Sequence, residues 1–314
     1  MMHRIWLLPI AMALVAGLRC GNDRAISPPE VAVLKGDFAI DSRQSLEELA
    51  RREDGFFYIT GSLLIVNTDL ETLKGLEKLT GIGGSLEIRF NPSLRSLRGL
   101  DHLTSVGDSL ADTGQNALQG LPKPAHVVEG LLITDNDALT SLAGLQNLAF
   151  VGGGLSFIYN SSLQSMQPLN HLRRIRGSVD FLSNYALSTL EGLHNLERIE
   201  GYLDIDDNQS LTTLNGLNGL VHIERDLIIR FNDVLTSLAG LSALARLGGQ
   251  ATIDNNAALP DSLVQAFVAQ IDAEMLGNRL IHPAAPRAQL LAMRRPADMS
   301  RRLLGSGRLT DPHR

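Results

Sequence analysis

Three aspartates offer the clearest chemistry in this 314-residue sequence. Asp180 and Asp204 hold the same position in adjacent copies of an internal repeat, and Asp206 follows soon after Asp204. Two carboxyl groups held close together can act as general acid and general base in the cleavage of a saccharide. No histidine or lysine pattern accompanies these aspartates, so we predict a solvated acidic patch and no enzyme. Cleavage of a polysaccharide by the three aspartates is the alternative.

The same segment also begins like a calcium-binding loop, with the pattern Asp204-x-Asp206-x-Asn208. Such a loop needs glycine at its sixth position and glutamate at its twelfth. Here these positions are Gln209 and Asn215, which excludes a loop of that type. The eight histidines do not cluster at the spacing of metal ligands either. The sequence therefore predicts neither a metal ion nor a cofactor.

The N-terminus predicts export. Residues 5–18 form an apolar run that is short for a transmembrane helix and typical of a signal peptide. Cys20, which follows this run, resembles the lipid-attachment site of bacterial lipoproteins, although that family prefers a smaller residue than Arg19 before the cysteine. We therefore expect a lipid-anchored protein of the bacterial cell envelope, in the outer membrane or at the cell surface. The alternatives are cleavage near Ala16 or Gly17, giving a periplasmic or secreted protein with a free thiol, and an uncleaved anchor.

The composition restricts the remaining chemistry. The net charge is −6 and the pI is near 5.8, so the chain has no basic excess with which to neutralise nucleic-acid phosphates. Cys20 is the only cysteine, which excludes disulfides and cysteine-based metal sites from the folded part. Apolar residues make up 44% of the chain but aromatic residues only 4%. This combination favours a core of aliphatic side chains arranged in regular layers.

An internal repeat supplies such layers. Asparagine recurs at a fixed spacing, at Asn67, Asn91, Asn136, Asn160, Asn184, Asn208, Asn232 and Asn256. All but one of the intervals are equal, at about 24 residues, which is a period typical of solenoids. The interval from Asn91 to Asn136 is longer and falls slightly short of two periods, so we predict a shortened coil there, with Gln115 in the asparagine column. The sequence therefore predicts a solenoid of about nine coils.

Each coil repeats one apolar pattern around its asparagine. In the coil of Asn91, Leu86 and Ile88 alternate with polar residues, which predicts a strand with one buried face. Leucines follow, and then the Gly99-Leu100 pair. No coil can bury its apolar side chains alone, so we expect coils to stack as parallel strands about 4.8 Å apart. The asparagines are predicted to form a structural ladder that bonds the backbone where each strand turns.

This repeat resembles that of the receptor L-domain, which overlaps with leucine-rich repeats. The pattern Leu-x-Ile-x-x-Asn-x-x-Leu-x-Ser-Leu-x-Gly-Leu-x-x-Leu occurs over residues 86–103 and, closely, over 227–244. The resemblance covers residues 61–259 and implies a right-handed, parallel β-helix-like stack. L-domains form ligand-binding lobes of growth-factor receptors and occur in bacterial surface proteins, which implies binding. The disulfides that often close the receptor domains cannot form here, so receptor-like signalling is not implied.

The flanking segments are predicted to be caps and tails. The expected order is a signal peptide with Cys20 (1–20), a tether (21–35), an N-terminal cap of strand plus helix (36–60), the solenoid (61–259), a C-terminal cap helix (260–281) and a basic, disordered tail (282–314). Capping boxes that begin at Ser45 and Ser262 are predicted to open the two helices. An amphipathic helix that contacts a membrane or nucleic acid is the alternative for the tail.

Binding residues are expected on the outward side of the strands, where side chains are not needed for the core. The candidates combine apolar, aromatic and charged side chains: Leu132, Ile158, Tyr159, Leu182, Asp204, Asp206, Arg230 and Phe231. Such anchors rimmed by charge suit the recognition of a protein or a polysaccharide. The predicted function is therefore an exported binding module. A passive structural or adhesive spacer of the cell envelope is the alternative.

Overall fold

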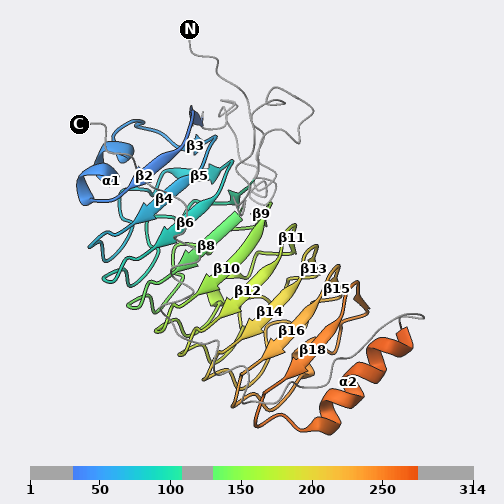
Figure 1. The fold of residues 1–314 in the computed structure, drawn as a ribbon. Helices are drawn as coiled ribbons and strands as arrows, with labels where there is room; N and C mark the ends of the chain where they lie inside the picture. Colours follow the sequence, from blue (N-terminus) through green and yellow to red (C-terminus); the bar gives the residue numbers. More distant parts are fainter. Residues whose placement is uncertain (1–30, 108–129, 275–314) are drawn as a thin grey trace, which may run out of the picture. The chain divides into compact units, whose positions relative to one another are not determined.

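The computed structural model describes residues 31–107 and 130–274, which form a parallel β-solenoid of about eight turns. Each turn contributes one strand to each of two parallel, nine-stranded sheets, and the N-terminal cap adds the ninth strand of each (Figure 1). Sheet A contains β1 (Ala32–Leu34), β3 (Phe57–Ile59), β5 (Leu79–Ile82), β7 (Ser105–Val106), β9 (Phe150–Val151), β11 (Arg174–Ile175), β13 (Arg198–Ile199), β15 (His222–Ile223) and β17 (Arg246–Leu247). Sheet B contains β2 (Phe38–Ile40), β4 (Leu63–Val66), β6 (Leu86–Arg89), β8 (Gly130–Thr134), β10 (Gly154–Ile158), β12 (Val179–Leu182), β14 (Leu203–Asp206), β16 (Leu227–Arg230) and β18 (Ala251–Asp254).

The predicted alternation sets the register of sheet B. Leu155 is paired with Val179, and Val179 with Leu203, so equivalent residues of successive coils lie side by side. In β12 and β14 the first and third residues are buried, while the second and fourth are partly exposed. The inward residues join one continuous core that consists mainly of leucine, isoleucine and valine. Phe157 and Phe181 stack within it, with their ring centroids 5.8 Å apart.

The asparagine ladder is present. The Oδ1 atom of Asn184 accepts hydrogen bonds from the backbone N–H and the Nδ2 of Asn160, at 3.2 and 3.3 Å. The Nδ2 of Asn184 donates to the carbonyl oxygens of Phe157 and Leu182, at 2.9 and 3.3 Å. Each buried asparagine thus bonds its own strand and the coil before it. The same arrangement recurs from Asn91 to Asn256.

Asn67 is not part of this ladder, contrary to the prediction. It is exposed, and Thr68 takes the ladder position, with its N–H and Oγ1 both donating to the Oδ1 of Asn91. Leu63 pairs with Leu86, so this coil is one residue shorter than the repeat. The regular interval between Asn67 and Asn91 therefore does not mark equivalent positions.

The predicted count of nine coils is corrected as well. Ile88 of β6 pairs directly with Ile133 of β8, and the N–H of Asn91 donates to the Oδ1 of Asn136 at 3.2 Å. No coil can lie between two hydrogen-bonded strands, so the shortened coil predicted there is not part of the stack. Gln115 itself lies outside the described residues. Sheet B nevertheless has nine strands because β2, in the N-terminal cap, extends it.

The N-terminal cap begins earlier than predicted. Residues 32–34, expected in the tether, form β1 and pair with β3. Helix α1 (Arg43–Ala50) begins after Ser42, because Ser42 and Ser45 each accept a hydrogen bond from the other's backbone N–H. Ser45 is therefore the third helical residue and not the cap itself.

The C-terminal cap helix α2 (Asp261–Glu274) also starts before the predicted capping box at Ser262. Its residues Phe267 and Ile271 are buried in the core cluster, whereas Leu263 is 42% exposed. Two short 3-10 helices, η3 (Gln167–Leu169) and η4 (Ala239–Leu241), lie in the connections between the sheets.

Candidate functional site on the outer face of sheet B

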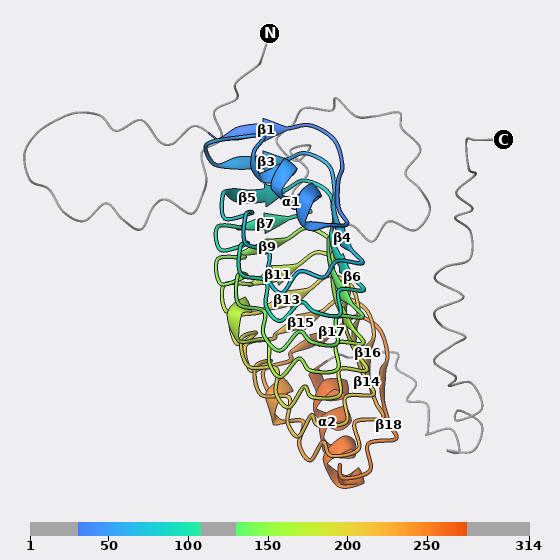
Figure 2. The same cartoon turned by 90° about the vertical axis from the view of Figure 1, so that its left-hand side faces the viewer.

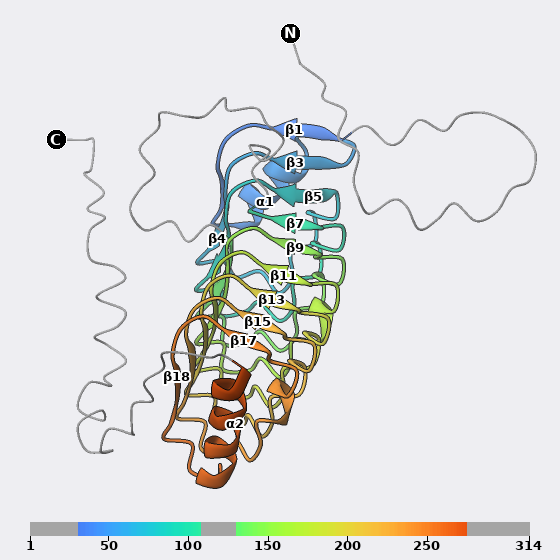
Figure 3. The same ribbon diagram turned by 90° about the vertical axis from the view of Figure 1, so that its right-hand side faces the viewer.

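The outer face of sheet B is the side whose residues alternate with those of the core. Figures 2 and 3 show the stack from its two sides, with α1 near one end and α2 at the other. Neither helix covers the middle of the sheet (Figure 1). Among the described residues, this leaves the outward side chains of β8 to β16 available to a ligand.

Strand register brings the predicted binding residues together in two columns. The first column runs through Leu132, Ser156, Asp180, Asp204 and Ile228, which are paired in that order. The second column runs through Thr134, Ile158, Leu182, Asp206 and Arg230. Apolar residues therefore lie mainly on β8 to β12, and the charged ones on β12 to β16. All ten are buried or half-buried among their neighbours in the sheet.

A third column follows the strands directly and contains the predicted Tyr159 and Phe231, together with Phe90. Phe90, Tyr159 and Phe231 have φ of 56°, 55° and 56°, in the left-handed region. Asparagine and aspartate tolerate this region best among residues that carry a side chain, and they occupy it in other coils, as at Asp135 and Asn255. Phe90 is 39% exposed. The aromatic residues thus lie at the edge of the outer face in a backbone conformation that is unfavourable for bulky side chains.

The three aspartates form one network with their neighbours. Asp180 pairs with Asp204 in adjacent strands, as their spacing of one repeat predicts. The Oγ of Ser156 donates to Asp180 at 2.7 Å. The Nη2 of Arg230 lies 3.3 Å from Asp206 and 4.0 Å from Asp204. One arginine is therefore shared by two carboxylates.

Burial changes the protonation of this network. Burial, together with the nearby Asp206, raises the pKa of Asp204 to about 7, while Arg230 acts in the opposite direction. Burial also raises the pKa of Asp180, against hydrogen bonds from Ser156 and Tyr202. The pKa of Tyr202 rises to about 12 through burial and the neighbouring Asp180. The Oδ1 of Asp204 is buried without a hydrogen-bond partner among the described residues.

Two members of this network were not predicted. Ser156 lies one repeat before Asp180, so the repeat period alone would have placed it beside that carboxyl group. Tyr202 precedes β14 and is outside the alternation that marks outward positions, so only the folded backbone shows its contact with Asp180. Within residues 31–107 and 130–274, no group of three or more His, Cys, Asp or Glu could hold a metal ion.

The outer side of sheet A differs because its charges neutralise one another from coil to coil. Arg198 forms an ion pair with Glu224, and Arg174 with Glu200. Arg173 lies 3.2 Å from Glu197 in the same way. Such exposed pairs contribute little to stability, but each one compensates the charge of its partner. The mixed apolar and acidic surface belongs to sheet B.

The part of the chain that the structure describes contains no helix long and apolar enough to cross a membrane. Cys20, the predicted lipid-attachment residue, and the tail from residue 282 lie outside that part. No protein-family model matches the sequence, and comparisons with curated proteins and with solved structures also give no match. The similarity to the receptor L-domain repeat therefore stays a prediction from the sequence.

Proposed function

We propose that this protein is a non-enzymatic binding module of the receptor L-domain type, exported and held at the cell envelope through Cys20. In this proposal, the outer face of sheet B binds a protein ligand. The observation that carries it is the presence of three aromatic residues in left-handed conformation, interspersed with aspartate and serine, in one column at the edge of that face.

The cost of that conformation is the first step of the argument. A bulky residue with positive φ is disfavoured by about 1 kcal/mol or more. Asp207 and Asn255 occupy the same column at φ of 61° and 54°, so the fold accepts residues that avoid much of this cost. The aromatic residues Phe90, Tyr159 and Phe231 bear this conformational cost, which supports a role that outweighs the cost. Contact with a ligand is such a role.

The composition of the adjacent surface supports a protein as the ligand. Ile158 and Leu182 are direct neighbours in the second column, and Leu132 lies on the strand beside Ile158. Asp206 and Arg230 continue that column with paired charges. An apolar centre with aromatic residues and a charged rim is the usual anatomy of a protein interface.

The test is a comparison of two double variants. Ile158→Thr with Leu182→Thr removes the apolar centre and introduces β-branched side chains that suit a strand. Leu64→Thr with Val66→Thr makes the same kind of change at outward positions of β4, which β6 and β8 separate from β10 in the same sheet. Both variants and the original protein are used to recover partners from solubilised cell envelope.

We expect the original protein and the β4 variant to recover the same partner, and the Ile158/Leu182 variant to lose most of it. Equal recovery by all three proteins would contradict a ligand on this face and would favour the passive spacer.

A further inference from the structure

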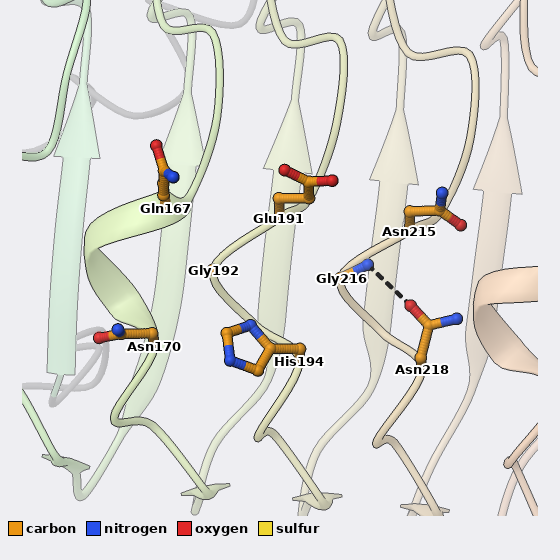
Figure 4. A pocket seen from close by; sticks show the side chains of 8 residues that line it. All are labelled: Gln167, Asn170, Glu191, Gly192, His194, Asn215, Gly216 and Asn218. Atoms are coloured by element: carbon orange, nitrogen blue, oxygen red, sulfur yellow. Dashed lines mark hydrogen bonds between the residues drawn. The ribbon is translucent and has the colours of Figure 1, made fainter.

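A second surface of the solenoid, on the connections that run from sheet B to sheet A, carries a polar groove of about 450 Å³. Two rows of side chains line it. Gln167, Glu191 and Asn215 form one row, and Asn170, His194 and Asn218 form the other (Figure 4). The groove crosses three successive coils. It shares no residue with the outer face of sheet B.

The repeat itself produces the floor of the groove. Gly192 and Gly216 lie between the two rows and have φ of 114° and 110°. A Cβ atom at Gly192 would come within 1.9 Å of the carbonyl oxygen of Met166, and one at Gly216 within 2.0 Å of that of Leu190. Side chains are therefore excluded from the floor by close contact between successive backbones.

The polar rows also have defined ends. Residues of the first row directly precede the glycine position of their coil, and the equivalent residues in the flanking coils are Ala143 and Ala239. In the second row, the equivalent Gln146 is already engaged, because it bonds the N–H of Gly144 at 2.8 Å and Asp101 at 2.9 Å. The groove is thus a local feature and does not extend along the whole solenoid.

Hydrogen-bonding groups in the groove are unused. In earlier coils the second-row side chain bonds the glycine N–H, as Asp101 does for Gly99 at 2.8 Å. Asn218 does the same for Gly216 at 3.1 Å, but His194 makes no such bond to Gly192 (Figure 4). The Oδ1 of Asn170 is also without a hydrogen-bond partner among the described residues, but it is buried and points away from the other lining side chains (Figure 4). Four further residues of the groove are exposed and form no side-chain hydrogen bond within the described part of the chain, so their polar groups can reach a ligand: Gln167, Glu191, His194 and Asn215.

We propose that this groove binds a neutral oligosaccharide. Amide side chains present a donor and an acceptor together, which matches neighbouring sugar hydroxyls that also donate and accept. No lysine or arginine lines the groove, and Glu191 is its only carboxylate, so neither a phosphate nor a strong cation is favoured. The volume lies within the range of small-molecule sites. With coils about 4.8 Å apart, each row spans about 10 Å, the size of a disaccharide.

The test follows the amide signals of Gly192 and Gly216 by two-dimensional NMR of the full chain. The probes are cellobiose, maltose, lactose and diacetylchitobiose, with inorganic phosphate and galacturonate as charged controls. We expect at least one neutral disaccharide to shift both glycine signals in a saturable way. Glu191→Ala with Asn215→Ala should weaken this binding about tenfold or more, because it removes hydrogen bonds to the sugar. The fold should be unaffected, since both side chains are exposed to solvent in the free protein. Gln164→Ala, an exposed change in the same connection as Gln167 but outside the lining of the groove, should leave binding unchanged.

Shifts caused only by the charged probes, or no shift by any disaccharide, would overturn the proposal. Saturable binding that the Glu191/Asn215 variant retains in full would overturn it as well. Because the proposal does not depend on sheet B, the Ile158/Leu182 variant should bind the disaccharide normally, which separates its outcome from that of the proposed protein interface.

Discussion

Each buried asparagine joins two coils through both ends of one amide group. Its oxygen receives two donors from the preceding coil, and its nitrogen donates to two carbonyl groups, one of its own strand and one of the preceding coil. The strand turns at this point, and the asparagine supplies hydrogen bonds to backbone groups on both sides of the turn. A buried polar group without a partner costs free energy, and the ladder removes that cost once in every coil.

Asn184→Ala in the middle of the ladder should lower the free energy of unfolding by about 1–3 kcal/mol, because it removes four hydrogen bonds from the interior. Urea denaturation measures the loss. The matched control is Asn67→Gly, which removes an exposed amide outside the ladder and accommodates φ of 55°. A loss as large in the control would show that the two asparagines are equivalent, against the structure.

Asp204 makes stability depend on pH. Its pKa is about 7 in the folded protein, above the ordinary value of 3.8, so the folded state holds a proton that the unfolded state has released. Its contribution to stability therefore falls as pH rises from about 4 to about 7. Asp204→Asn removes this loss, and we expect it to stabilise the protein by about 1–3 kcal/mol at pH 8.

At pH 4 the Asp204→Asn variant and the original protein should unfold at nearly the same urea concentration, since this pH is close to the ordinary pKa of 3.8 and Asp204 has so far lost little of its contribution to stability. Asp69→Asn, at an exposed position, serves as the control and should show no such pH-dependent difference. A gain in stability at Asp204→Asn that is the same at pH 4 and pH 8 would contradict a burial-raised pKa.

The connections between the sheets depend on close packing of one backbone against the next. Gly192 has a φ of 114°, and its lack of a side chain lets the backbone of the preceding coil approach closely. Gly36 has a similar φ of 99°, but a Cβ there would meet nothing within 4 Å. Substitution of Gly36 therefore measures the free-energy cost of a positive φ alone, whereas substitution of Gly192 adds the cost of a steric clash.

Gly192→Ala should destabilise the protein by more than about 3 kcal/mol, whereas Gly36→Ala should cost only about 1 kcal/mol for its positive φ. Thermal or urea denaturation of both variants tests the difference. Similar losses would mean that conformation alone requires glycine in this column.

At the scale of the whole molecule, each coil contacts mainly its two neighbours, so the ends need separate elements. Helix α2 contributes Phe267 and Ile271 to the core at one end, and α1 contributes Leu46 and Leu49 at the other. The two candidate surfaces lie between these caps. A solenoid can present several independent surfaces in this way, because each column of outward residues is free to differ from the next.

Cys20→Ser tests how the whole protein is placed in the cell. If Cys20 carries the lipid, the variant should move from the membrane fraction to the soluble fraction after export, because the lipid chain supplies the attachment to the membrane. Fractionation followed by immunoblotting measures this, with the exposed change Gln164→Ala as control. Retention of the variant in the membrane fraction would remove the lipid anchor from the proposal.

The repeat period was sufficient to predict the strands, the inward leucines, most of the ladder and the pairing of Asp180 with Asp204. This is because stacked coils interact through identical columns, so a spacing in the chain becomes a contact between neighbours. Where the chain departs from its period, the predictions from the sequence were wrong. Asn67 kept the spacing but not the position, and the long interval around Gln115 suggested a coil that the direct pairing of β6 with β8 excludes.

Only the tertiary structure decided how polar side chains are used. Gln146 and His194 hold equivalent positions in their coils, yet one is bonded to the backbone and the other is free to meet a ligand. Likewise, burial of Asp204 and the sharing of Arg230 follow from the packing around them. Sequence spacing determines which residues become neighbours. Their chemistry depends on hydrogen bonds and desolvation, which change with differences of tenths of an ångström in distance, and only the folded backbone sets these distances.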